Sequence, residues 1–155
     1  MLLETTLQGY LGQHIRDICP IGYANDSDNH CAHFVSHVLG YQFGATCRTM
    51  KRGQGTPGSI RVHEVFARCV DVGRWDELPV PLFWGLVFIT NASNVNLGTQ
   101  TMSNVPRKHI GIFTVDPEPS TITRTAGTRS SARPPSSSAI TIPLPTTPCS
   151  GAALP

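Results

Sequence analysis

The chain has 155 residues, of which 39% are hydrophobic and only 14% charged, and its formal net charge is +2 at pH 7. This length fits one small globular domain with irregular segments and is too short for two full domains. The nearly balanced charge shows neither a basic nucleic-acid face nor an acidic tail, so we expect no nucleic-acid partner.

Targeting signals are not evident in the sequence. No apolar run approaches the roughly 20 residues that a membrane helix needs, and the opening residues lack the basic and then apolar regions of a secretory signal. We therefore expect no membrane span and a cytoplasmic location by default, from which release or delivery to a cell wall would need another route.

The cysteines do not follow a familiar framework. Their number is odd, their spacing is irregular and no C-x-x-C pair occurs, which argues against a disulfide scaffold or a zinc ribbon. The five are Cys19, Cys31, Cys47, Cys69 and Cys149. We expect Cys19 and Cys69 to be structural, and Cys47 and Cys149 to lie in a loop and in the tail without partners.

The composition changes after Asp116. All 11 aromatic residues (Phe 6, Tyr 3, Trp 2) lie at or before Phe113, whereas residues 117–155 are rich in Pro, Ser and Thr and contain one acid, Glu118. Such a segment has too little apolar surface to offset its ordering entropy. We expect a folded unit over 1–116 and a disordered tail over 117–155.

Apolar spacing predicts three helices in the folded unit. The first covers 7–18 and ends before Cys19-Pro20, where proline disfavours continuation. The second covers 31–39, with Asp28 or Asn29 as N-cap and Gly40 beyond its last turn. The third covers 62–70, capped by Ser59 and ended near Gly73.

Two apolar runs that follow these helices predict strands, over 82–90 and 109–115. Helices first and strands afterwards indicate an α+β domain in which N-terminal helices pack on a small antiparallel sheet.

Cys31 and His109 are the residues that point to chemistry. Cys31 begins a predicted helix, where free backbone N–H groups and the positive dipole end favour the thiolate. His109 opens the second strand, and its imidazole could take the thiol proton and return it to a leaving amine. The backbone N–H of Cys31 would then supply part of an oxyanion hole.

Three segments resemble one known group in order and spacing. Cys31-Ala32-His33-Phe34-Val35 resembles the nucleophile helix of papain-like cell-wall hydrolases, the NlpC/P60 and CHAP families. Gly85-Leu86-Val87-Phe88-Ile89 and Lys108-His109-Ile110-Gly111-Ile112-Phe113 resemble two of their strands. The resemblance covers about residues 19–115, without the acid that normally precedes the cysteine or the Asp of the first strand.

The resemblance implies a papain-like fold and hydrolysis of peptide or amide bonds, in peptidoglycan, through a thioester. It assigns Cys31 as nucleophile and His109 as base, with Tyr23 near the oxyanion. Trp84, beside the predicted strand that should flank the cleft, is a further substrate candidate on account of its aromatic side chain. The chemistry needs no metal or organic cofactor. Alternatives are a catalytically inactive binding or structural module of the same fold, and a protein-directed acyltransferase or deamidase.

The third catalytic group is missing from its expected place. Families of this kind carry an orienting residue about a dozen positions after the histidine, where this chain has Ser120-Thr121-Ile122-Thr123. Two interpretations remain open: a native Ser/Thr/Pro-rich tail, or the last strands of a truncated domain translated in a shifted reading frame.

Each of two other groups of residues could be either an ordinary solvent-exposed feature or a binding site. His33 and His37 lie one helical turn apart and suggest a metal site, but no carboxylate shares their face, and we expect both side chains in solvent. Arg48, Lys51 and Arg52 form a basic cluster that is either a solvated loop or a receptor for substrate carboxylates.

Overall fold

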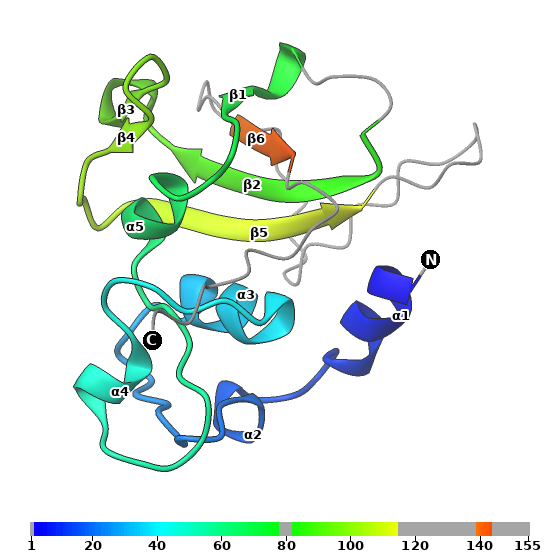
Figure 1. The fold of residues 1–155 in the computed structure, drawn as a ribbon, viewed down its shortest axis with the longest axis vertical. Helices are drawn as coiled ribbons and strands as arrows, with labels where there is room; N and C mark the ends of the chain where they lie inside the picture. Colours follow the sequence, from blue (N-terminus) through cyan, green and yellow to red (C-terminus); the bar gives the residue numbers. More distant parts are fainter. Residues whose placement is uncertain (1, 78–81, 115–138, 144–155) are drawn as a thin grey trace, which may run out of the picture. The chain divides into compact units, whose positions relative to one another are not determined.

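The computed structural model describes residues 2–77, 82–114 and 139–143 (Figure 1). The chain divides between Val65 and Phe66 into two units, the first helical and the second built on strands, where we had expected one folded unit. Helices and antiparallel strands together confirm the α+β class. The papain-like arrangement stays a prediction.

The first predicted helix is broken in two. The structure has α1 over Leu2–Gly9 and α2 over Ile15–Ile18, joined by a turn. Gly12 in this turn has a φ of 77°, in the left-handed region that glycine adopts without steric cost. The expectation of one helix over 7–18 was wrong because the apolar spacing continues through a glycine that reverses the backbone.

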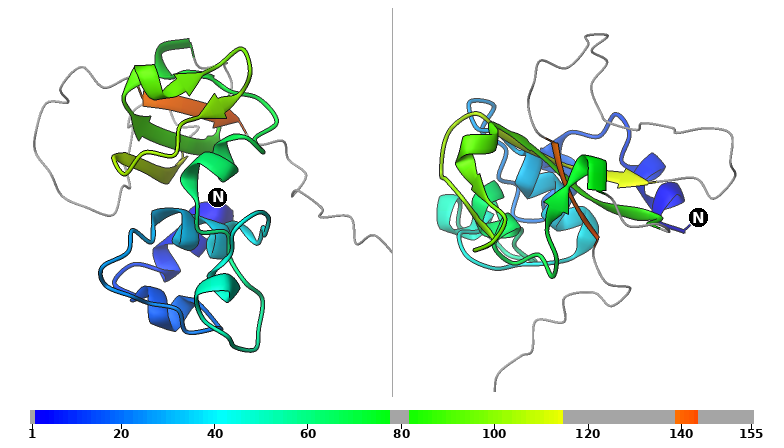
Figure 2. Two further views of the ribbon diagram at one scale, coloured as in Figure 1. Left: turned by 90° about the vertical axis from the view of Figure 1, so that its left-hand side faces the viewer. Right: turned by 90° about the horizontal axis from the view of Figure 1, so that it is seen from above.

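The predicted second helix is confirmed as α3 over Cys31–Leu39. Gly40 ends it with a φ of 72°, as a left-handed C-cap. His30 occupies the N-cap position, and Asn29 contributes the capping oxygen instead, because its Oδ1 accepts the Cys31 N–H at 3.1 Å. Figures 1 and 2 show α3 lying with α2 and α4 in the helical unit.

Two short helices complete this unit: α4 over Cys47–Met50 and α5 over Val62–Phe66. The third predicted helix therefore ends well before Val70, whose side chain is exposed. Cys69, which we expected to be structural, is buried.

Ser59 is not the helix cap that we expected but part of a buried polar connection. Its N–H donates to Ser36 Oγ at 2.7 Å, and its own Oγ donates to the Phe43 carbonyl at 2.9 Å. The same Oγ accepts the Phe43 N–H at 2.9 Å. This hydroxyl holds the segment after α3 against the segment before α5, with both its donor and its acceptor capacity used.

The strand unit contains a four-stranded antiparallel sheet in the order β1-β6-β2-β5. Its strands are β1 over Gly73–Arg74, β6 over Ala139–Pro143, β2 over Trp84–Thr90 and β5 over Lys108–Thr114. Beside it stand a β3–β4 hairpin, Val95–Asn96 and Thr101–Met102, and two 3-10 turns, η1 over Trp75–Glu77 and η2 over Ala92–Asn94.

β2 and β5 confirm the two predicted strands, whereas β6 lies within the stretch that we expected to be a disordered tail. Its backbone pairs with β2 along five positions, from Gly85 opposite Pro143 to Ile89 opposite Ala139. Three consecutive β-branched residues, Ile140, Thr141 and Ile142, favour a strand there, so the expectation of disorder does not hold for 139–143. Cys149 and Ser120 to Thr123 lie outside the described residues.

The two faces of the β2–β5 ladder differ in burial. Leu86, Phe88 and Ile110 are almost fully buried and share one face, because cross-strand partners point the same way and successive residues alternate. The Phe66 ring packs edge-on against Phe88, with centroids 5.3 Å apart.

Among the described residues, no helix has both the length and the apolar character needed to cross a membrane.

Replacing Ser59 by Ala should lower the free energy of unfolding by about 1–3 kcal/mol, because the Phe43 peptide groups lose a buried partner. Urea denaturation followed by circular dichroism measures the change. Ser27→Ala, the same substitution at an exposed residue, is the control and should change stability little. Equal stability of the two variants would contradict the role given to Ser59.

Candidate functional site

Cys31 is the first residue of α3, and its side chain is half-buried. The first turn of α3 carries no acidic side chain, so no carboxylate within that turn offsets the positive end of the helix dipole. The Cys31 N–H, which we expected in an oxyanion hole, is donated to Asn29 Oδ1 in this structure. The sulfur thus has the predicted local setting, while the expected oxyanion donor is engaged.

Tyr23 lies in the same unit, but its hydroxyl is also engaged. The Tyr23 O–H donates to Asp28 Oδ2. Burial of the hydroxyl, and to a smaller extent the negative charge and hydrogen bond of Asp28, raise the pKa of Tyr23 to about 12. Its ring packs against His30 and His33, with centroid distances of 5.3 and 5.6 Å. In this arrangement Tyr23 organises the loop before α3 and has no hydroxyl proton left for an oxyanion.

His109 and Trp84 belong to the strand unit and are far apart on its ladder. His109 lies opposite Ile89, near one end, whereas Trp84 lies opposite Thr114 at the other end. The alternation of side chains also puts them on opposite faces of the sheet. Trp84 and the His109 imidazole therefore do not lie side by side on this sheet.

The His109 side chain is exposed overall, yet its imidazole is shielded enough from water for desolvation to lower its pKa below the ordinary value. A lowered pKa keeps the ring neutral near pH 7, which is the form that a general base needs. Cys31 with Tyr23, and His109 with Trp84, thus sit in separate units. The pairing of Cys31 with His109 stays a prediction.

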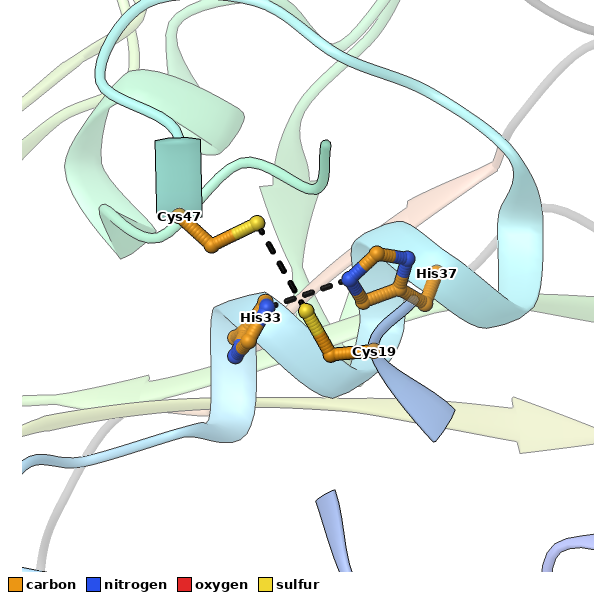
Figure 3. A group of neighbouring side chains, drawn as sticks. All are labelled: Cys19, His33, His37 and Cys47. Carbon is orange, nitrogen blue, oxygen red and sulfur yellow. Dashed lines mark hydrogen bonds between the residues drawn. The ribbon is translucent and has the colours of Figure 1, made fainter. Parts of the chain in front are cut away.

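A second group of side chains lies on the other side of α3. His33 and His37 project from consecutive turns toward Cys19, which follows α2, and Cys47, which begins α4 (Figure 3). One ligand atom from each of the four lies within 4.8 Å of every other. The two sulfurs are 3.8 Å apart, and the two Nε2 atoms are 3.1 Å apart.

This group, hereafter the Cys/His cluster, is withdrawn from water. The exposed fraction is 0% for His33 and Cys47 and 3% for Cys19, and His37 is half-buried. Desolvation, with smaller contributions from His37 and His30, lowers the pKa of His33 to about 4. Burial also lowers the pKa of His37 and raises that of Cys47. Both imidazoles are consequently neutral near pH 7.

Neighbouring groups hold the members of the Cys/His cluster in place. His33 Nδ1 lies 3.1 Å from His30 Nδ1, and His30 Nε2 lies 2.9 Å from the Asn25 carbonyl. The Gly58 N–H donates to Cys47 Sγ at 3.3 Å. A Cβ on Gly58 would come within 3.0 Å of His37 Nε2, so glycine at this position allows the imidazole to approach the backbone.

The Cys/His cluster corrects three expectations. His33 and His37 do not face solvent, and Cys47 is a buried residue of a helix rather than a loop residue without a partner. The His-x-x-x-His spacing was the signal in the sequence. The lack of a carboxylate on the same face led to the expectation of solvent exposure. The two cysteines that complete the cluster lie far from this pair along the chain, one on each side, and no short motif joins them to it.

The basic cluster favours its ordinary interpretation. Lys51 Nζ donates to the Gly22 carbonyl at 2.8 Å, and Arg48 donates to the Gly55 carbonyl. These two side chains connect loops of the helical unit, which leaves Arg52 as the remaining member for a substrate carboxylate.

Comparison of the chain with protein-family models, with curated proteins and with solved structures found no match.

Asn29→Ala should destabilise the protein by about 0.5–2 kcal/mol, because α3 loses its capping oxygen. Asn29→Asp keeps the oxygen and should retain most of the stability, but its carboxylate disfavours a thiolate at Cys31. Alkylation of Cys31 by iodoacetamide at pH 7, followed by peptide mass analysis, should therefore be slower in Asn29→Asp than in the parent chain. Faster alkylation in Asn29→Asp would contradict this account of the helix end.

Proposed function

We propose that the chain is a cysteine hydrolase that cleaves peptide or amide bonds, with peptidoglycan as the substrate class. The observation that carries the proposal is the setting of Cys31: a half-buried thiol on the first residue of α3, in a first turn without acidic side chains. A helix end of this kind stabilises a thiolate, which is the nucleophilic form of cysteine.

The chemistry needs a base as well as a nucleophile. In the proposal, His109 takes the Cys31 proton, Sγ attacks the carbonyl carbon, and the imidazolium returns the proton to the departing amine. Water then hydrolyses the thioester to release the acid and regenerate the thiol. The neutral state that its lowered pKa gives His109 suits the first of these steps.

The oxyanion of each tetrahedral intermediate requires a hydrogen-bond donor, and both donors that we expected for it make other contacts. The Cys31 N–H is donated to Asn29, and the Tyr23 O–H to Asp28. Exchange of the Asn29 contact for one with the oxyanion would make the Cys31 N–H a donor that acts chiefly in the transition state, which is how an oxyanion donor accelerates acyl transfer.

Purified murein incubated with the chain should yield fragments with new amine and carboxyl ends, detected by mass spectrometry as products of added water. Cys31→Ser and His109→Ala should each reduce product formation by a factor of about 100 or more, which is the magnitude of general acid–base catalysis. Ile89→Ala, which removes the cross-strand partner of His109 and no proton carrier, should retain activity.

The alternatives give different results in the same set of variants. An inactive module forms no fragments, and its Cys31 alkylates equally fast in the parent chain and in the His109→Ala variant. An acyltransferase or deamidase labels or deamidates protein substrates and leaves murein intact. Preferential alkylation of Cys31 below the pH at which an ordinary thiol reacts, lost in His109→Ala, would support the proposed pair.

A further inference from the structure

We infer that Cys19, His33, His37 and Cys47 form a structural zinc site, in which the two thiolates and two imidazoles surround one Zn²⁺. This inference is independent of the proposed hydrolase, because the Cys/His cluster contains neither Cys31 nor His109. It rests on the geometry of four ligand atoms that converge from three separate helical segments.

Two of the distances within the cluster fit a tetrahedral ion. With Zn–S of about 2.3 Å and Zn–N of about 2.0 Å, the edges of a tetrahedron are about 3.8 Å between sulfurs and about 3.3 Å between nitrogens. The Cys19 and Cys47 sulfurs are 3.8 Å apart, and the His33 and His37 Nε2 atoms are 3.1 Å apart. Two edges of different chemistry thus agree with one central ion.

The tautomer of His33 also fits. The Asn25 carbonyl can only accept, so His30 Nε2 carries a proton. In that tautomer His30 Nδ1 accepts from His33 Nδ1–H. This order leaves a lone pair on His33 Nε2, the atom that lies 3.1 Å from His37 Nε2. Metal-bound histidines typically donate their second ring N–H in this way, which fixes the ring and the tautomer.

A disulfide between Cys19 and Cys47 explains less of the arrangement. It would require the sulfurs to approach to about 2.05 Å and would make no use of the two imidazoles that lie beside them. The Gly58 N–H donated to Cys47 Sγ is a contact that stabilises a thiolate, which is the form a metal binds. Two thiolates with two imidazoles in a tetrahedron are donors typical of zinc.

The site would be structural rather than catalytic. Four protein ligands complete a tetrahedron and leave no position for a water or substrate. The segments that it joins include α2 and α4, each of four residues, which are too short to be stable alone. The apolar cluster around it is small, with Ile21 and Tyr23 beside the two cysteines and Ile60 against them. The ion would therefore add stability that this small core does not provide by apolar burial alone.

Binding has a defined proton balance. Each cysteine enters as a thiol and binds as a thiolate, so one Zn²⁺ displaces two protons to solvent when both are protonated beforehand, and no electron is transferred. Affinity for zinc should consequently rise with pH over the range in which the free thiols are protonated.

The test uses the full chain purified without chelator, with metal measured by inductively coupled plasma mass spectrometry. We expect one zinc per chain. Cys19→Ser, Cys47→Ser and His37→Ala should each lose bound zinc or weaken its affinity about tenfold or more. The matched controls, Cys31→Ser for a thiol and His109→Ala for an imidazole, should both keep one zinc per chain, whether or not the chain hydrolyses murein.

Titration of the metal-free wild-type chain with Co²⁺ covers the case in which a ligand variant does not fold. The expected spectrum has the visible absorption of tetrahedral Co²⁺ and near-ultraviolet thiolate-to-metal charge transfer, both abolished by added Zn²⁺. A folded wild-type chain that takes up neither ion, or retention of full zinc by all three ligand variants, would overturn the inference.

Discussion

The helical unit depends on the mutual burial of four polar side chains. Cys19, His33, His37 and Cys47 are taken out of water together, and desolvation of this kind is costly unless each group finds a partner. Their convergence brings together the end of α2, the start of α4 and one side of α3. A unit whose helices are mostly short needs such a fixed point, because propensity alone does not hold four-residue helices.

Two groups of side chains with different proposed roles lie on different sides of α3. His33 and His37 face the Cys/His cluster, while Cys31 stands at the N-terminal end about half a turn around the helix. His30 connects the two, since it occupies the N-cap position directly before Cys31 and contacts His33 through Nδ1. The orientation of the His33 imidazole is therefore linked, through His30, to the start of the helix that carries the proposed nucleophile.

In the strand unit, the alternation of side chains along β5 decides on which face His109 lies. One face of the β2–β5 ladder is closed by Leu86, Phe88 and Ile110, and the alternation of the strand then presents His109 on the opposite face. β6 adds a third strand against β2 by backbone hydrogen bonds. The position of His109 thus follows from the burial of its neighbours along the strand.

Local patterns in the sequence were sufficient for α3, for β2 and β5, and for the glycine that ends α3. Apolar periodicity and glycine conformation act over a few residues, so one segment carries all the information. The break at Gly12, the short α5 and the pairing of β6 escaped this reasoning, because helix length and strand partners are decided by competing contacts elsewhere in the chain.

The Cys/His cluster lay beyond local patterns for the same reason. The sequence shows two histidines one turn apart and two distant cysteines, and the usual rule for histidines on a helix assigned the polar pair to solvent. Only the tertiary structure brings Cys19 and Cys47 to that side of α3, because their approach depends on how the loops between the helices close. Local periodicity determined which residues share a face of each helix, and long-range packing decided which other segments contact that face.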